Sequence, residues 1–364
     1  MNKSSRGRSS ETVKTKAVRR VDWIGFALLL FVLGCRFLTP LADFYSLHCY
    51  PVISSVLSLP ASVVRFSLEE IAVLLLVFLA VRLIVVSVKQ KRGFPFYLKR
   101  TVVLIMWAVV WFYIGWGNNY FRTPLYQRAG IERVHFDKED FIAFLENFTE
   151  GLNSTAGSYP ELSVEEMESQ IKSFYKENNH PLGYTVLRKW QHVKNPLFSP
   201  LYSAVSVLGF MGPFFCESQV NLEVPSIEYP SSLAHEMAHL CGVTSEAEAN
   251  YWSYVFCRQS SDNGVRYSGY LHLLPYVLGN ARSLLSEEEY SSWLQKIDKR
   301  AIDDYNAFRE YWQGKRVKIL NDIQYSLMDL MLRSNNVSEG AKDYTGVVSM
   351  VITMDSSGRT RNSN

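Results

Sequence analysis

The chain has 364 residues, a formal net charge of +3 and 48% hydrophobic residues. This near balance of charge offers no basic surface for nucleic acid, so we expect no nucleic-acid partner. Five cysteines in a chain of this length exclude a disulfide-dense scaffold. The apolar residues are concentrated in the first third of the chain, which predicts a membrane region followed by one larger domain.

Three apolar runs occupy the N-terminal third, and each is close to the about 20 residues that a helix needs to cross a bilayer. They predict three transmembrane helices within residues 23–120. One alternative is a buried helical hairpin in a soluble protein. For the first run, another is a bacterial lipoprotein signal, in which Cys35 would be acylated, although the match to such a signal is weak. The three runs are residues 23–41, 71–88 and 102–117.

The basic residues around these runs predict the orientation. Lys and Arg are frequent in residues 1–22 and again in residues 89–100, whereas residues 42–64 contain neither. Because cytoplasmic flanks carry the excess of Lys and Arg, residues 1–22 form a cytoplasmic tail and the chain after residue 120 lies outside. The prediction is a multi-pass protein of the cytoplasmic membrane, with the lipid bilayer as its partner.

The outer part, residues 121–354, is expected to be mostly helical, and residues 355–364 form a polar, disordered tail. Residues 201–215 are apolar but contain Gly and Pro, which favours a small β element or an irregular cleft floor over a fourth span. Charged and apolar residues alternate with helical periodicity in several segments. The expected helices are residues 137–149, 163–179, 267–281, 285–314 and 321–333.

The pentapeptide His-Glu-Met-Ala-His at positions 235–239 is the strongest chemical signal in the chain. On an α-helix, His235 and His239 lie one turn apart on the same face, so both imidazoles can bind one metal ion. Glu236 then lies beside that ion, where a carboxylate can act as a general base toward water. The pattern is typical of zinc metallopeptidases and predicts Zn²⁺ as the cofactor and Glu236 as the catalytic residue.

The residues around the pentapeptide predict a helix with defined ends. Pro230 ends the preceding segment, and Ser231 or Ser232 is expected to cap the first turn. Gly242 is expected to end the helix in a left-handed turn. A second helix then begins near Ser245 and returns toward the first, which brings its first carboxylates to the two histidines.

A catalytic zinc needs a third protein ligand and an open position for water. Glu246 and Glu248 are the two candidates, and Glu246 is favoured because Ser245 and Glu248 have the spacing of a capping box. Glu246-x-x-Ala249-Asn250 is also similar to the Glu-x-x-Ala-Asp helix of gluzincin peptidases. That similarity implies that Glu246 binds zinc and that Asn250 supports a ligand histidine.

With these residues in view, the chain resembles a family of bacterial membrane proteins known as domain of unknown function 3810. The resemblance implies N-terminal spans followed by an outer, zincin-like zinc domain, which makes the expected fold mainly α with three transmembrane helices and a small β element. Where the family usually has Thr-Gly before its Glu, this chain has Phe215 and Cys216. The matching stretches are residues 212–221, 235–242, 246–250 and 267–270.

The sequence therefore predicts a membrane-anchored zinc metallopeptidase that hydrolyses a peptide or protein substrate on the outer face of the membrane. Tyr267, Tyr270 and Tyr344 are candidate donors to the developing oxyanion. The alternative is a non-catalytic membrane protein, such as a sensor or assembly factor, in which zinc is structural. A fourth carboxylate ligand, Glu217 or Glu248, would favour that alternative, although Glu217 could instead line the cleft with Asn221.

Overall fold

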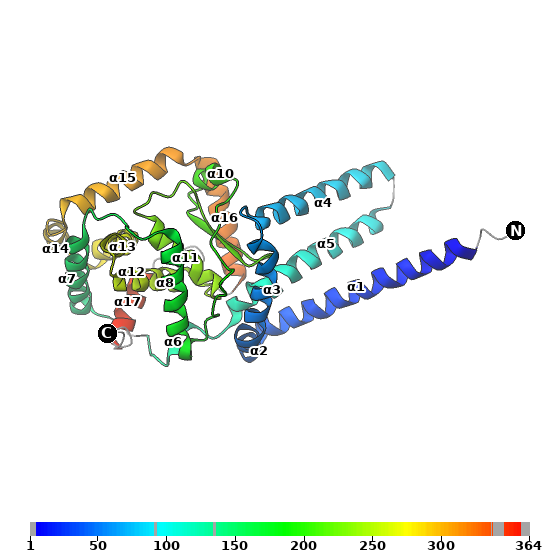
Figure 1. Ribbon diagram of the computed structural model, residues 1–364, viewed down its shortest axis with the longest axis horizontal. Helices are drawn as coiled ribbons and strands as arrows, with labels where there is room; N and C mark the ends of the chain where they lie inside the picture. Colours follow the sequence, from blue (N-terminus) through cyan, green and yellow to red (C-terminus); the bar gives the residue numbers. More distant parts are fainter. Residues whose placement is uncertain (1–4, 91–92, 134–135, 336, 338–345, 358–364) are drawn as a thin grey trace.

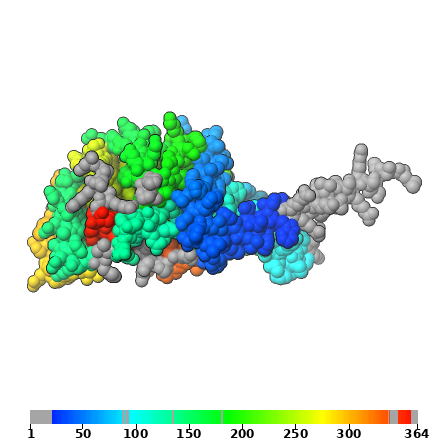
Figure 2. Space-filling view, turned by 90° about the horizontal axis from the view of Figure 1, so that it is seen from below, coloured from blue at the N-terminus to red at the C-terminus, as the bar shows by residue number. Residues whose placement is uncertain are grey.

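The computed structural model describes residues 5–90, 93–133, 136–335, 337 and 346–357 (Figure 1). A rounded, mainly helical domain lies at one end, and three long helices from the N-terminal third extend from it side by side. The space-filling view shows these N-terminal helices, in blue and cyan, projecting beyond the rounded domain (Figure 2). The three long helices are α1 (Ser5–Phe37), α4 (Leu68–Gln90) and α5 (Phe94–Gly115).

The segment between α1 and α4 is helical, whereas the sequence suggested a connecting loop. Pro40 and Pro51 each lie in the first turn of a helix, where the missing N–H has no intrahelical partner to lose. The chain therefore turns sharply after α1 but remains helical. The elements of this segment are α2 (Thr39–Phe44), a π-helical turn at Tyr45–Cys49 and α3 (Tyr50–Ser62).

Among the described residues, length and composition mark one helix, α5, as able to cross a membrane. A second span is counted if Val21–Phe37 and Thr39–Ser62, which meet at a bend of 113°, act together. The predicted run at residues 71–88 does lie in a single helix, α4. Length and composition therefore support one or two candidate spans among the described residues, and the predicted three are not confirmed.

The rounded domain is built mainly from helices, as predicted. Its capping residues define several starts: Asp137 and Ser163 each form a reciprocal capping box with the residue three positions later. Its elements are α6 (Leu125–Ala129), α7 (Lys138–Thr155), α8 (Val164–Glu177), α9 (Asn179–Leu182), α10 (Ser199–Ala204), β1 (Gly209–Gly212), β2 (Glu217–Val220), α11 (Tyr229–Leu240), α12 (Glu246–Gln259), α13 (Asn263–Leu284), α14 (Glu287–Leu294), α15 (Lys299–Lys315), α16 (Lys318–Ser334) and α17 (Val347–Ser356).

Two helix predictions differ from the structure. The single helix expected over residues 285–314 is two helices, α14 and α15, because Asp298 accepts the backbone N–H of Arg300 and caps a new start. The helix expected from residue 267 begins earlier, after Asp262, whose carboxylate accepts the N–H groups of Gly264 and Val265. Both differences come from aspartate caps.

The predicted β element is a two-stranded antiparallel hairpin, β1–β2, in which Gly209 pairs with Val220 and Gly212 with Glu217. It lies against α11, the helix that carries the pentapeptide. Residues 201–215 therefore form α10, a short connection and β1 rather than a fourth span. The hairpin supplies one wall of the candidate site.

The core of the domain is formed by α11, α12 and α13, which pack on one another. The side chains of Leu233, Met237 and Tyr251 are almost fully buried there. Two side chains from the N-terminal region reach this core: Tyr50 donates to the carbonyl of Leu240, and the Trp116 indole donates to that of His239, both over 2.8 Å. The N-terminal helices thus contact the pentapeptide helix directly.

Candidate metal centre

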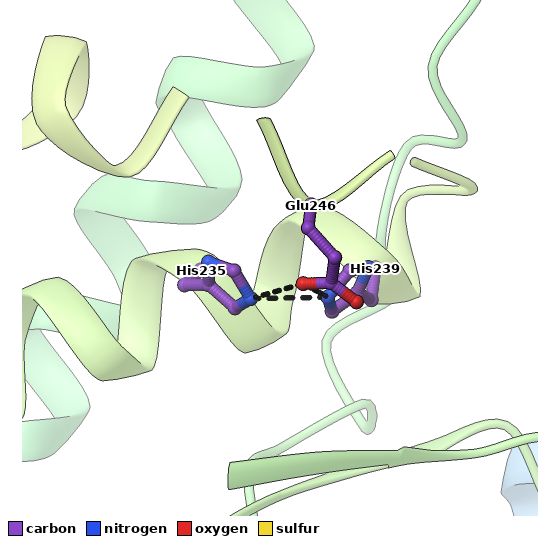
Figure 3. A group of neighbouring side chains, drawn as sticks. All are labelled: His235, His239 and Glu246. Carbon is purple, nitrogen blue, oxygen red and sulfur yellow. Dashed lines mark hydrogen bonds and ion pairs between the residues drawn. The ribbon is translucent and has the colours of Figure 1, made fainter. Parts of the chain in front are cut away.

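Three side chains from two helices converge on one point (Figure 3). His235 and His239 project from the same face of α11, and Glu246 reaches them from the first turn of α12. Gly242, whose φ of 93° lies in the left-handed region, makes the turn that brings α12 back to α11. Ser245 caps α12 by accepting the N–H of Glu248.

The cap expected for α11 differs from the structure. The prediction that Ser231 or Ser232 caps this helix is wrong, because α11 already begins at Tyr229 with Pro230 in its first turn.

The spacing of the three ligand atoms fits a zinc ion. Nε2 of His235 and Nε2 of His239 are 3.1 Å apart, and Oε2 of Glu246 lies 3.2 Å and 3.5 Å from them, respectively. Bonds of about 2.0–2.1 Å to a tetrahedral zinc ion place its ligand atoms about 3.3 Å from one another. The three atoms therefore already have the separations of three corners of such a site.

The hydrogen bonds and charges of the three side chains also suit a ligand set. Nδ1 of His239 lies 2.9 Å from the carbonyl oxygen of Val243, which can only accept, so Nδ1 carries a hydrogen and Nε2 is the nitrogen that faces Glu246. Burial alone would raise the pKa of Glu246, but the imidazoles of His239 and His235 outweigh it and hold that pKa well below its usual value. Glu246 is therefore an anion, and its charge outweighs the effect of burial on His239 and raises the pKa of that histidine to about 9.

Glu236 lies in the same cavity, and its side chain is buried against the hairpin. Burial raises the pKa of Glu236 to about 7, because the charged form loses its hydration and the nearby histidines offset only part of that loss. A carboxyl group with such a pKa can accept and release a proton near neutral pH. A Cβ added to Gly209 of β1 would lie 2.4 Å from Cγ and Oε1 of Glu236, so only a glycine leaves room for this carboxylate.

Glu248, the other candidate ligand, points away from the histidines. Its Oε1 accepts hydrogen bonds from Arg128 over 2.7 Å and from the Tyr184 hydroxyl over 2.8 Å. The ion pair is buried, and Tyr184 in turn accepts the indole N–H of Trp252. Glu248 thus has a structural role, as the sequence suggested, but its side chain performs it through a distant arginine and a tyrosine, and only its backbone N–H takes part in the helix cap.

Asn250 has a different partner from the one expected. Its Oδ1 lies 2.9 Å from Nε2 of His272, and its amide nitrogen is 3.5 Å from the Tyr276 hydroxyl. Burial lowers the pKa of His272 to about 3, so its ring is neutral. His272 and Tyr276, both on α13, line the cavity beside His235, and the sequence pattern gave no signal for either.

The metal centre lies in a cavity of about 890 Å³. Its walls come from β1, α11, α12, α13 and α16 and from the ends of α4 and α5 nearest the rounded domain. The carboxylate, imidazole and phenol side chains in its wall are Glu69, Tyr120, His235, Glu236, His239, Glu246, His272, Tyr276 and Tyr325.

Two of the three candidate oxyanion donors, Tyr267 and Tyr270, are not brought to this cavity. The Tyr267 hydroxyl donates to Asp304, and Tyr270 lines a separate cavity beside Phe148. Tyr344 lies outside the described residues. Tyr276 is the tyrosine of α13 that lines the cavity of the metal centre.

Glu217 and Asn221 do not line that cavity either. Glu217 is buried in an ion pair with Lys194 over 2.8 Å and accepts hydrogen bonds from Ser67 and from the backbone N–H of Glu69. Asn221 donates to the Ser203 hydroxyl in α10 and to the carbonyl of Val207 in the connection before β1. Both residues hold the hairpin in place instead of contacting a ligand.

A protein-family model with the description "Protein of unknown function (DUF3810)" matches residues 45–352, which include every residue of the metal centre. No curated protein and no solved structure matches the chain significantly. The comparisons thus give a family without an activity, and the chemistry of the site rests on its own geometry.

Proposed function

The chain belongs to the DUF3810 family, and we propose that it is a membrane-anchored zinc metallopeptidase that hydrolyses peptide bonds on the outer face of the cytoplasmic membrane. The observation that carries this proposal is the convergence of His235, His239 and Glu246 at zinc-ligand separations, with Glu236 in the same cavity. Three protein ligands and an adjacent carboxylate are the arrangement of a catalytic zinc site.

The proposed anchor consists of α1, α4 and α5. Large apolar side chains are exposed along all three helices, for example those of Phe26, Phe78 and Ile105, and water would solvate such a surface poorly. The described parts of the basic segments 1–22 and 89–100 lie at the ends of these helices remote from the rounded domain. By the positive-inside tendency, those ends are cytoplasmic and the rounded domain is outside.

His235, His239 and Glu246 would hold Zn²⁺, which when bound supplies a Lewis acid for the peptide carbonyl and lowers the pKa of water. Glu236 takes the proton of the attacking water and returns it to the leaving amine, which its raised pKa permits. The neutral ring of His272 and the hydroxyl of Tyr276 lie in the cavity wall, where they can position the substrate.

The alternative, a zinc ion that only joins α11 to α12, requires a fourth protein ligand to close the site. Glu248 and Glu217 are the carboxylates that the sequence offered for this role, and both are engaged elsewhere, with Arg128 and Lys194, respectively. This leaves a position for water and favours catalysis over a structural role.

Elemental analysis of the full chain, purified in detergent without chelators, tests the ligand set. We expect about one zinc per chain in the parent and loss of zinc in His235→Ala and Glu246→Ala. His192→Ala, at a partly exposed histidine outside the cavity, is the matched control and should keep the zinc. Zinc that persists after Glu246→Ala would remove Glu246 from the proposed ligands, and a parent without zinc would contradict the proposal.

Gly209→Ala is expected to lower turnover by about tenfold or more, because the new methyl group displaces the Glu236 carboxylate that acts as the base. Zinc content should not change, because the atoms nearest to the added Cβ all belong to Glu236 and not to the three ligand side chains. Gly279→Ala is the matched control, since a Cβ there meets no atom within 4 Å. Full turnover in Gly209→Ala would contradict the role given to this contact.

A further inference from the structure

The cavity of the metal centre has an apolar wall opposite the ligands. Leu320, Ile323 and Leu327 of α16 form one side of it, and Val73 of α4 and Phe112 of α5 form the other. These elements are far apart in the sequence and meet where the N-terminal helices join the rounded domain (Figure 1). A substrate bound at the histidines therefore also contacts apolar side chains next to the proposed membrane region.

Helix α16 is attached to that region at its C-terminal end. Nη1 of Arg36, in α1, donates to the carbonyl of Ser334 over 2.6 Å, and the Tyr113 hydroxyl, in α5, donates to Asn335 over 2.7 Å. Along its length, α16 exposes large apolar side chains, and Leu332 is the one residue of this helix that is buried. The helix thus presents an apolar surface beside the outer ends of the proposed spans.

The cavity wall offers no basic side chain to an acidic substrate. Its carboxyl groups are those of Glu69, Glu236 and Glu246, and among the described lining residues there is no Lys or Arg. A substrate rich in carboxylates, such as a peptidoglycan stem peptide, would therefore find no Lys or Arg in this wall to pair with its charges. An apolar polypeptide segment would instead bury its side chains against α16.

We propose that the substrate is an apolar segment of a membrane-associated polypeptide, which reaches the metal centre from the bilayer surface through the gap between α16 and the outer ends of α4 and α5. This inference rests on the proposed peptidase function and names its substrate class. The segment leaves the bilayer with its apolar side chains already next to Ile323 and Leu327, so the cost of exposing them to water is avoided.

Binding without turnover provides the test. Full-length Glu236→Gln protein in phosphatidylethanolamine–phosphatidylglycerol nanodiscs is irradiated with a short peptide of Ala, Leu, Val and Phe that carries a photoreactive benzoylphenylalanine. A matched peptide has Glu and Ser in place of Leu, Val and Phe. We expect labelling of the rounded domain by the apolar peptide only, and displacement of that label by excess of the same peptide without the photoreactive group.

The double variant Ile323→Gln/Leu327→Gln should lower the affinity for the apolar peptide by about fivefold or more, because two apolar contacts become polar. Ile319→Gln/Leu330→Gln is the matched control: these side chains are 72% and 66% exposed on α16, against 53% and 62% for the first pair, but do not line the cavity. Equal labelling in the two double variants would overturn the inference, as would displacement of the label by phospholipid alone.

Turnover by the parent protein separates this inference from the peptidase proposal. Saturable binding of the apolar peptide at α16 without hydrolysis by the parent would keep α16 as a binding surface for apolar segments, but would remove the proposed reaction and with it the assignment of such a segment as substrate. Hydrolysis of the acidic peptide in preference to the apolar one would keep the reaction and overturn the inference. Hydrolysis of the apolar peptide with a raised KM in Ile323→Gln/Leu327→Gln would support both.

Discussion

Glu236→Gln is expected to lower peptide hydrolysis by a factor of about 10² to 10⁴, because glutamine has almost the same shape as glutamate but cannot take a proton from water. Zinc content should be unchanged, since the ligand atoms belong to His235, His239 and Glu246. The measurement is hydrolysis of a set of internally quenched peptides by the full chain, with zinc determined on the same samples.

The control is Glu223→Gln, which changes a carboxylate paired with Lys315 outside the cavity and should leave hydrolysis as it is in the parent. An equal rate in Glu236→Gln and the parent would contradict a catalytic role for Glu236. In that case, with zinc still bound, the structural-zinc alternative would become the better account of the site.

Glu248→Ala is expected to destabilise the protein by about 3–5 kcal/mol, because it leaves a buried guanidinium without its counter-charge. Burial alone would lower the pKa of Arg128, but Glu248 holds it above its usual value. Burial and the charge of Arg128 lower the pKa of the neighbouring Arg122 to about 10, so removal of Glu248 leaves two buried cations side by side. For a domain of this size the melting temperature should fall by roughly 6–20 °C.

Tryptophan fluorescence of the detergent-purified chain can follow this transition, since Trp252 donates to Tyr184 within the same cluster. Asp303→Ala is the matched control, because its ion pair with Lys299 is exposed and should contribute little. Zinc should remain bound in Glu248→Ala below the melting temperature. Loss of zinc without a fall in melting temperature would instead make Glu248 a metal ligand.

In the membrane region, the sequence predicted the helices better than it predicted their connections. Apolar runs of sufficient length form helices wherever no residue breaks the backbone pattern, and most of each run does so in α1, α4 and α5, although the first run is interrupted at Leu38. The segment at residues 42–64 was expected to be the loop between the first two runs. It is helical because Tyr45 and Tyr50 are buried against the neighbouring helices, a contact that no local sequence pattern predicts.

The sequence by itself determined the part of the site that lies within one helix. The spacing of four residues places His235 and His239 on one face, and Gly242 permits the left-handed turn that ends the helix. These properties depend on backbone geometry over a few residues, so they can be read without the fold.

Only the tertiary structure decided which carboxylate joins the histidines, what Asn250 contacts and what lines the cavity. Glu246 faces the histidines while Glu248 is drawn to Arg128, a residue 120 positions earlier in the chain. Asn250 contacts His272, and Leu327 of α16 lines the cavity, each through packing between helices distant in sequence. Such contacts depend on how the helices pack together, and the period of the local sequence carries no information about that packing.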